Sequence, residues 1–466
     1  MRNNKLFLIT ALIGLVFTSC EQDDDPTVLP GVSVSVTQNT FSEGDGTIVV
    51  SFSTTETFAT DATLTYEVSG TATAGEDYET LSGNLTLSAG ENTVTQNLVL
   101  RDDDEVEQSE EITITLTAVD GETEFVASDN TITLTITDND SFAYENGILV
   151  LHEGNFFGGN ASVSFVTEDL GTTTNGIFNE VNAAALGDIA QSMTFNGDLA
   201  YIVVNNSQKV EVVNRYTFET VATIDTGFLN PRYMAIANGK GYVTNWGDGS
   251  DPDDDYVAVV NLENNTVEDT IEVPEGPEWI LANENTLYVA HQGGFGQNNI
   301  VSVIDATTDM TGNAITVADR PNSMQLANGS LWVLSGGNPS WTGNETAGQL
   351  DKISTADNSV EETFEFALTE HPGYLSVDGE DLYYLLSGSV YKMNASDTAL
   401  PTTAEITGVS FYDMTVNEGR LYGVDAKDFV SNGSLEIYDL SDNSLVDSLE
   451  TSIIPGAVYF NGAFEF

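Results

Sequence analysis

Apolar and polar residues alternate regularly over residues 31–140 of the chain. The alternation has a period of two, which places every second side chain on one face of a β-strand, whereas a helix needs a period near 3.6. Glycine, asparagine and aspartate separate the apolar runs, as is typical of turns between strands. The pattern predicts an antiparallel, immunoglobulin-like sandwich of about seven strands. The alternating apolar positions are Val32, Val34 and Val36; Leu64, Tyr66 and Val68; Leu85 and Leu87; Ile112, Ile114 and Leu116; and Ile132, Leu134 and Ile136.

Residues 141–466 repeat a different pattern seven times. Each repeat has an apolar strand, a turn built on Asn, Gly or Asp, and a second strand with an aromatic or large apolar residue near its start. A repeat of roughly 45 residues with about four strands is typical of a β-propeller blade. The sequence therefore predicts an all-β chain in which the sandwich precedes a seven-bladed propeller. The equivalent positions, 39 to 52 residues apart, are Leu149, Tyr201, Tyr242, Tyr288, Trp332, Tyr383 and Tyr422.

The last apolar run, residues 455–460, has no complete repeat after it. We expect this run to pair with the strand at Ile148 and to close the ring, because closure removes the free edges that invite aggregation. The tetrapeptide Tyr242-Val-Thr-Asn245 is the one that names a class of propeller repeats, the YVTN type.

Two kinds of loop should meet on one face of such a propeller: those that enter each first strand and those that leave each second strand. Aromatic and amide residues dominate both kinds, although a scaffold requires only turn residues there. This pattern indicates a ligand-binding face, with packing between blades as the alternative for any single aromatic residue. The candidate ligand-binding residues are Asn155, Phe156, Asn206, Arg232, Tyr233, Trp246, His291, Arg320, Trp341 and Tyr374.

The chain is strongly acidic, with 12 Lys and Arg against 73 Asp and Glu, a formal net charge of −61. A surface of this sign repels phosphate backbones and excludes nucleic acid as an expected partner. In the first domain the carboxylates cluster at strand ends, in residues 43–45, 76–77, 102–111 and 138–140. Calcium takes six to eight hard oxygen ligands, which such clusters supply. The alternatives are a calcium site and a merely solvated acidic rim.

The N-terminus has the pattern of an export signal. Arg2 and Lys5 precede an apolar run, residues 6–17, that is too short to span a bilayer as a helix. Small residues then precede Cys20, the single cysteine, in a way that resembles a bacterial lipoprotein cleavage box. We expect a signal peptide at 1–19, a lipid on Cys20 and an acidic tether at 20–30, which resembles the export tags of surface lipoproteins in Bacteroidetes. Ordinary secretory cleavage is the alternative.

No enzyme motif stands out in the sequence. The three histidines, His152, His291 and His371, fall on the predicted loop-rich face, but their spacing is not that of metal ligands, and hydrogen-bonding histidines are the expected interpretation. There is no Gly-x-Ser-x-Gly, His-Glu-x-x-His or phosphate-binding glycine loop. We therefore expect a binding protein and no catalytic residue, with a propeller lactonase or other hydrolase as the alternative.

The first domain resembles a Calx-β domain. The resemblance is carried by Ser42-Glu-Gly-Asp-Gly46, Ala74-Gly-Glu-Asp-Tyr78, the acidic stretch 102–111 and Asp138-Asn-Asp140. It implies a calcium-binding sandwich that could act as a stiff spacer. Asn139 stands where some members have aspartate, which lowers the charge of the site. The calcium ligands that the resemblance implies are Glu43, Asp77, Asp103, Glu107, Glu110, Asp138 and Asp140.

The second domain is similar to the BtuG-type surface propeller lipoproteins. The similarity is carried by His152-Glu-Gly-Asn155 with its following aromatic pair, Leu186-Gly-Asp188, Val203-Val-Asn-Asn206, Pro231-Arg-Tyr233 and Asp425-Ala-Lys-Asp428. It implies capture of cobalamin, or another corrinoid, and its delivery to a TonB-dependent transporter of the outer membrane, with the protein anchored there by lipid. A structural or adhesive surface protein is the other alternative.

Overall fold

The structure is a computed structural model that describes residues 31–465, apart from residue 56 and residues 121–125. The expected signal peptide, Cys20 and the acidic tether lie outside the described residues. The chain divides into two compact units, residues 1–141 and 142–466, which are considered separately below. Among the described residues, no helix has the length and apolar character needed to cross a membrane.

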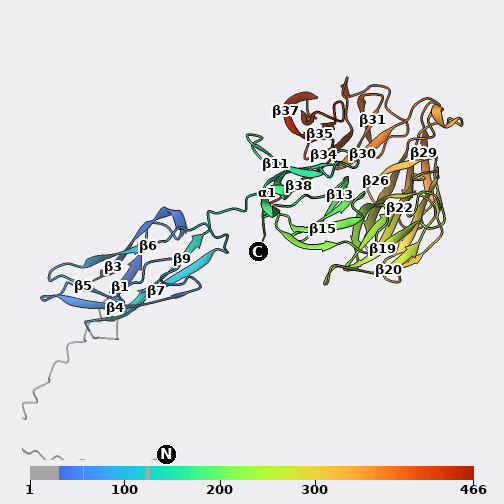
Figure 1. Ribbon diagram of the computed structural model, residues 1–466. Helices are drawn as coiled ribbons and strands as arrows, with labels where there is room; N and C mark the ends of the chain where they lie inside the picture. Colours follow the sequence, from blue (N-terminus) through green and yellow to red (C-terminus); the bar gives the residue numbers. More distant parts are fainter. Residues whose placement is uncertain (1–30, 56, 121–125, 466) are drawn as a thin grey trace, which may run out of the picture. The chain divides into compact units, whose positions relative to one another are not determined.

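The first unit is a sandwich of two sheets (Figure 1), with strand orders β6-β3-β1-β8 and β2-β9-β7-β4-β5. Nine strands are described, against about seven predicted, because the first apolar run divides between the sheets: β1 pairs with β3, and β2 pairs with β9. The β2–β9 and β1–β8 pairs are parallel, which alternation along one strand cannot reveal. The bounds are β1 Gly31–Ser35, β2 Thr40–Ser42, η1 Glu43–Asp45, β3 Thr47–Thr54, β4 Ala62–Gly70, β5 Asn84–Leu87, β6 Thr93–Val99, β7 Glu110–Val119, β8 Val126–Asp129 and β9 Thr131–Thr137.

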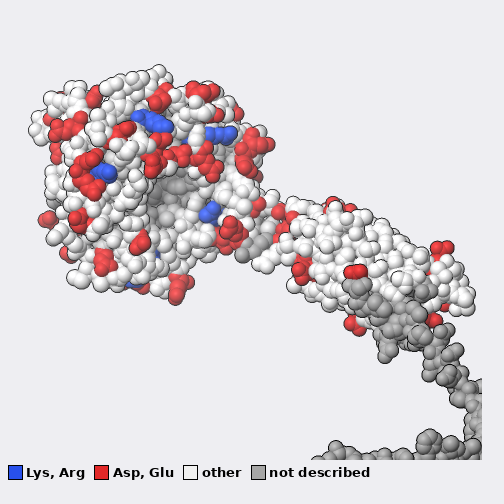
Figure 2. Space-filling model, turned by 180° about the vertical axis from the view of Figure 1, so that it is seen from behind, with Lys and Arg blue, Asp and Glu red and all other residues white. Residues whose placement is uncertain are grey.

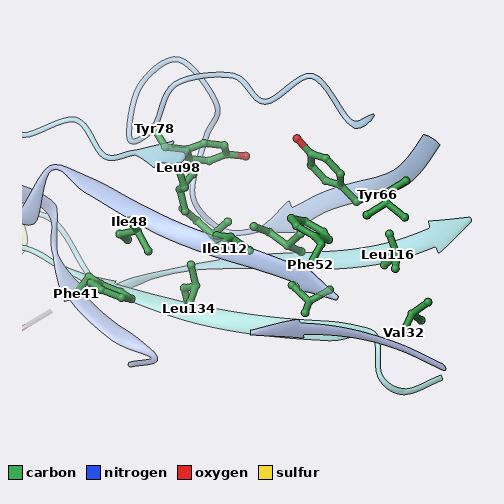
Figure 3. Packing of buried hydrophobic residues seen from close by; sticks show 14 of the residues in the cluster. Val32, Phe41, Ile48, Phe52, Tyr66, Tyr78, Leu98, Ile112, Leu116 and Leu134 are labelled. Atoms are coloured by element: carbon green, nitrogen blue, oxygen red, sulfur yellow. The ribbon is translucent and has the colours of Figure 1, made fainter. Parts of the chain in front are cut away.

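The alternating apolar residues form the core of this sandwich. Ile48 and Phe52 of one sheet pack with Ile112, Leu116 and Leu134 of the other in a single buried cluster (Figure 3). Burying side chains of this size stabilises the folded state by roughly 1.5–3 kcal/mol each. The period-two prediction is thus confirmed, because the residues that alternate in sequence are those that face the opposite sheet.

The second unit is a β-propeller of seven sheets in the described residues. The innermost strands are β38, β13, β17, β21, β26, β30 and β34, and each contacts the next around a ring. The first three sheets are β38 Pro455–Asn461 with β10 Gly147–His152, β11 Ser162–Thr167 and β12 Thr173–Asn175; β13 Ala190–Asn196, β14 Leu199–Val204, β15 Lys209–Asn214 and β16 Thr220–Ile224; and β17 Pro231–Ala237, β18 Lys240–Asn245, β19 Tyr256–Asn261 and β20 Thr266–Glu272. The next two are β21 Pro277–Asn283, β22 Thr286–His291, β23 Ile300–Asp305, β24 Met310–Thr311 and β25 Ile315–Thr316; and β26 Pro321–Ala327, β27 Ser330–Ser335, β28 Gln349–Ser354 and β29 Val360–Glu365. The last two are β30 Gly373–Asp378, β31 Asp381–Leu386, β32 Ser389–Asn394 and β33 Ile406–Thr407; and β34 Asp413–Asn417, β35 Arg420–Asp425, β36 Asn432–Asp439 and β37 Ser444–Ile453. Two short elements, α1 Ile177–Asn182 and η2 Ser340–Thr342, lie between strands.

The C-terminal strand closes the ring as predicted. Strand β38 pairs antiparallel with β10, and Phe460 lies opposite Ile148. The first sheet is therefore assembled from the two ends of the propeller sequence. Strand β38 comes last in the sequence and pairs with the first strand of the propeller, so this sheet closes the ring.

The repeated aromatic residue of the second strands connects neighbouring sheets. Tyr242 is fully buried, and its hydroxyl donates to Asp309 Oδ1 (2.7 Å) and lies 3.1 Å from the Ala306 carbonyl in the next sheet. The hydroxyl of the equivalent Tyr288 donates to Asn358 Oδ1 in the sheet after it (2.9 Å). A buried hydroxyl requires such a partner. The sequence repeat thus reflects the packing of one blade on the next.

Candidate functional site

A cavity of about 940 Å³ opens within the propeller. The first residues of all seven innermost strands line it, together with loops that follow the second strand of five sheets. These are the two kinds of segment that the sequence places on one face, and the structure brings them together. The volume lies at the upper end of the range for small-molecule sites.

Bulges at the start of the innermost strands shape this cavity. The pairing register shifts in six of the seven strands, and the residues in the shifts line the cavity. A bulge leaves a residue unpaired and turns its side chain away from the usual alternation. The bulges therefore direct side chains towards the interior of the ring that a regular strand would bury between sheets. The residues concerned are Gln191, Arg232, Tyr233, Glu278, Trp279, Asn322, Tyr374, Leu375 and Gly456.

The turn before five of the six bulges uses an unusual backbone conformation. The residue that precedes the first residue of the innermost strand has a positive φ in five sheets: Ile189, Asn230, Gly276, Arg320 and Ile454. Glycine and asparagine tolerate this conformation, whereas for isoleucine it is an outlier. Strain of this kind persists only where the surrounding structure enforces it, and it is commonly found at binding sites.

Aromatic rings form much of the cavity wall. Tyr233 lies 4.6 Å from Trp279 between ring centroids, and Trp246 lies 5.6 Å from Phe295. Phe156 is 63% exposed although its side chain is large and apolar. Exposed aromatic surface at the mouth of a cavity is unfavourable in water and is typical of a binding site.

The arginine of the cavity is already paired. Arg232 donates from Nε and Nη2 to the two carboxylate oxygens of Glu278, at 3.0 and 2.8 Å, and its guanidinium lies 3.9 Å from the centroid of Trp246. A two-point ion pair of this geometry holds the guanidinium in a fixed position. Glu278 thus binds two of the five N–H donors of Arg232, and the sequence-based expectation that Arg232 contacts a ligand stays a prediction.

Two further acids of the cavity have no basic partner among the described residues. Glu153 Oε2 accepts a hydrogen bond from the Tyr412 hydroxyl (3.1 Å), and Asp413 Oδ1 accepts one from the Met414 amide (2.6 Å). Burial raises the pKa of Asp413 to about 8, and burial also raises the pKa of Glu153. Each shift follows mainly from removing a carboxylate from water, and at Glu153 the positive charge of Arg232 offsets it only in part.

Five of the ten predicted ligand-binding residues line the cavity: Phe156, Arg232, Tyr233, Trp246 and Tyr374. The other five lie elsewhere. The Asn155 side chain donates to the Phe429 carbonyl (2.9 Å), and that of Asn206 donates to Asp188 (2.6 Å). Arg320 lies 5.9 Å from the centroid of Trp341, which is 78% exposed and outside the cavity lining.

All three histidines take part in structural hydrogen bonds. His291 is fully buried and bonds through Nε2 to Ser302 Oγ (2.8 Å), and the equivalent His152 bonds to Ser164 Oγ (2.8 Å). His371 Nδ1 lies 2.8 Å from the Gly336 carbonyl. The expectation that His291 contacts a ligand is not supported, because its ring is enclosed by the blade.

Sequence reasoning did not single out Glu153, Glu278, Trp279, Asp413 or Tyr459, all of which line the cavity. A signal for Glu278 and Trp279 was present. Pro231-Arg-Tyr233 and Pro277-Glu-Trp279 occupy equivalent positions in successive repeats, so an alignment of the repeats predicts a charged residue followed by an aromatic one at the same place.

The first unit carries two groups of three carboxylates, whose oxygen atoms lie within 4.8 Å of one another in each group. One group is Glu43, Asp138 and Asp140, and the other is Asp77, Glu107 and Glu110. Six of the seven implied calcium ligands are thus brought together. Asp103 belongs to neither group, and its Oδ1 accepts a hydrogen bond from the Glu105 amide instead (2.9 Å).

The electrostatics of these groups fit a cation. Burial, with repulsion from Asp138, raises the pKa of Glu43 to about 7. Burial, with contributions from Asp77, raises the pKa of Glu110 to about 7. Three carboxylates this close repel one another unless a positive charge lies between them, and a set made only of carboxylate oxygens suits calcium. Acidic side chains are scattered over the surface visible in Figure 2, where basic ones are few.

Asn139 lies beside the first group. Its Oδ1 accepts hydrogen bonds from Ser42 Oγ (2.7 Å) and from the Gly44 amide (3.1 Å), and its Nδ2 donates to Asp102 (3.1 Å). The Asn139 side chain thereby connects residues 42–44, Asp102 and its own segment, residues 138–140, without adding a negative charge.

Comparison with known proteins identifies both units. A family model described as a domain of unknown function, DUF5074, matches residues 146–450. The chain belongs to the DUF5074 family. A Calx-beta domain model matches residues 23–140, so the architecture is a Calx-β sandwich followed by a β-propeller. No curated protein matches the chain significantly.

Solved structures resemble parts of the chain, and the one with a TM-score above 0.5 agrees with the propeller fold. A functionally unknown protein from Desulfotomaculum acetoxidans is 12% identical, with 68% of this chain and 99% of that chain covered and a TM-score of 0.51. BamB from Moraxella catarrhalis is 12% identical, with 69% and 89% covered and a TM-score of 0.44. The apo form of the Calx CBD1 domain is 25% identical, with 24% and 99% covered and a TM-score of 0.22. These likenesses concern the fold and not the ligand.

Proposed function

We propose that this DUF5074 protein is a surface-displayed binding protein whose propeller captures a corrinoid, with cobalamin as the leading candidate. The observation that carries the proposal is the cavity of about 940 Å³ with its aromatic wall. The similarity of the propeller motifs to the BtuG-type lipoproteins names the ligand class. A hydrolase has no comparable support, because the histidines are engaged in structural hydrogen bonds.

The chemistry of the wall matches that ligand. A corrinoid is a broad, largely apolar ring rimmed with amides. Aromatic faces such as Trp246, Trp279 and Tyr374 suit the ring, and amide side chains that line the same cavity suit the rim. The amide residues are Gln191, Asn205, Asn230, Gln292, Asn322 and Gln325. The pairing of Arg232 with Glu278 moves the proposal away from recognition of the phosphate and towards recognition of the ring and its amides.

The rest of the chain has a supporting role in this proposal. The N-terminal signal and Cys20 would anchor the protein by lipid in the outer membrane, with the propeller facing the exterior. The Calx-β unit would bind calcium through Glu43, Asp138 and Asp140 and through Asp77, Glu107 and Glu110, and would then act as a stiff spacer. The captured ligand would pass to a TonB-dependent transporter.

A titration with cyanocobalamin tests the binding step. Two of the four tryptophans, Trp246 and Trp279, line the cavity, so a coloured ligand bound there should quench their fluorescence. We expect saturable quenching at micromolar protein and coloured protein after gel filtration. Trp341→Phe is the matched control, because Trp341 lies outside the cavity lining, and it should leave the affinity unchanged. A flat titration without retained colour would contradict corrinoid capture.

A further inference from the structure

The charges that line the propeller cavity are unbalanced. Its lining contains the acids Glu153, Glu278 and Asp413, and Arg232 is the one basic residue among the lining residues. Glu153 interacts electrostatically with both other acids, because Glu278 raises the pKa of Glu153 and Glu153 raises the pKa of Asp413. We refer to Glu153 and Asp413 as the unpaired acids of the cavity.

Arg232 offsets the charge of Glu153 only in part, since the pKa of Glu153 stays raised although the nearby guanidinium lowers it. The Arg232 side chain is largely enclosed, with 13% of its surface exposed, and both of its hydrogen bonds go to Glu278. Among the described residues no ion pair involves Glu153 or Asp413. The cavity therefore keeps an excess of acidic groups in a place of restricted solvent access, where an uncompensated carboxylate is costly.

The walls around the unpaired acids also favour a positive charge. The aromatic face of Trp246 already receives the guanidinium of Arg232 at 3.9 Å, and the rings of Tyr374 and Tyr412 lie near Glu153. The negative face of an aromatic ring attracts a cation, and the attraction is stronger where water is excluded. Aromatic walls and unpaired carboxylates thus independently favour the same ligand chemistry.

We propose that the cavity prefers a ligand that brings a positive charge to Glu153 and Asp413. This inference rests on the proposed function, because it assumes that the cavity is the ligand site, and it adds a selection by charge. A cation between the two acids would compensate both carboxylates at once. An anionic group at the same place would be repelled.

Proton release would accompany such binding. The pKa values of the two acids, about 8 for Asp413, are raised by burial that neighbouring charge does not fully compensate, and a cation would lower them. The charged and titratable groups that face the two acids are Tyr233, Tyr374, Tyr412, Tyr459, Arg232 and Glu278.

Two corrinoids that differ by a single charge provide the test. Replacing the cyanide on cobalt, an anion, with water adds one positive charge, so aquacobalamin and cyanocobalamin form a matched pair. We expect the full chain at pH 7 and low salt to bind aquacobalamin roughly tenfold more tightly, as for one unit of charge attracted across about 10 Å of a partly hydrated site. Added salt should reduce the difference.

Substitution of Glu153 and of Asp413 tests whether these two acids cause the preference for aquacobalamin. Glu153→Gln and, as a second and independent variant, Asp413→Asn should each bring the two affinities closer together. Glu361→Gln on the outer strand β29 makes the same change of charge at an exposed position and should keep the preference. Calorimetry in buffers of different ionisation enthalpy should show more protons released with aquacobalamin than with cyanocobalamin.

The outcomes separate the two proposals. Equal affinities in the unmodified protein, or a preference that survives both Glu153→Gln and Asp413→Asn, would overturn selection by charge and leave corrinoid capture standing. Binding of neither corrinoid would overturn both proposals.

Discussion

Removal of calcium should destabilise the Calx-β unit and leave the propeller unchanged. Each carboxylate group holds three acids with oxygen atoms within 4.8 Å of one another, and at that distance two negative charges repel by about 3 kcal/mol at an effective dielectric constant of 20. A cation that binds only the folded state relieves this repulsion. It adds about 2.7 kcal/mol to the free energy of unfolding at a concentration a hundredfold above its Kd.

That free energy predicts a large shift in melting temperature. For a domain of this size one occupied group should raise the midpoint by roughly 10–20 °C. Glu43→Gln and Glu110→Gln each remove a ligand from a different group. Each should lose half of the shift or more, because the Glu107 amide donates to Asp138 (2.6 Å) and so couples the two groups. Glu67→Gln, on the exposed side of β4, is the matched control.

The chain supplies its own internal reference for the assay. All four tryptophans, Trp246, Trp279, Trp332 and Trp341, belong to the propeller. Tryptophan fluorescence therefore follows only the second unit, whereas calorimetry follows both. We expect the calorimetric transition of the first unit to move between calcium and chelator while the fluorescence midpoint stays constant. Identical calorimetric traces in calcium and chelator would refute the reasoning.

Three further predictions concern the cavity and the N-terminus. Arg232→Met should lower the free energy of unfolding of the propeller by roughly 3–5 kcal/mol, because Glu278 is left buried without its partner, and the double change with Glu278→Met should recover much of this loss in thermal melting. Asp413 has a folded-state pKa raised to about 8, so the folded protein keeps a proton that the unfolded chain releases near pH 4. Its contribution to stability therefore falls as the pH rises from about 4 to about 8, by up to about 1.4 kcal/mol per pH unit. Asp413→Asn should make the dependence of the melting temperature on pH flatter over that window, and an unchanged dependence would disprove the shift. Cys20 should be labelled by an alkyne fatty acid in cells, and a Cys20→Ala protein that fractionates with membranes like the unmodified one would argue against lipidation.

The sequence predicted the fold well where one physical rule dominates. Alternation identified the sandwich core, and Leu64, Ile112 and Leu116 are buried as a period of two requires. The repeat spacing identified the propeller, and the unpartnered final run identified the closing strand opposite Ile148. Pairing direction was less predictable, because whether β2 lies parallel or antiparallel to β9 depends on the path of the chain between the sheets.

The cavity was only partly predictable, because bulges decide which side chains face it. Tyr374 and Trp279 line the cavity through shifts in register that no alternation rule contains. Arg232 was expected to meet a ligand, yet its partner Glu278 lies 46 residues away, in the next repeat. Trp341 was expected to bind ligand because tryptophan on a loop is rare, but a short 3₁₀ helix holds it outside the cavity lining.

A crystal structure of the full chain with cyanocobalamin would test the central claim most directly. We expect corrin density inside the propeller cavity, with the ring against Trp246 and Tyr374 and its amides near the amide side chains of the innermost strands. We also expect the Arg232–Glu278 pair to stay intact, because breaking it would leave Glu278 buried without its partner. Density for the ligand at any other place, or an empty cavity at saturating cyanocobalamin, would contradict the account.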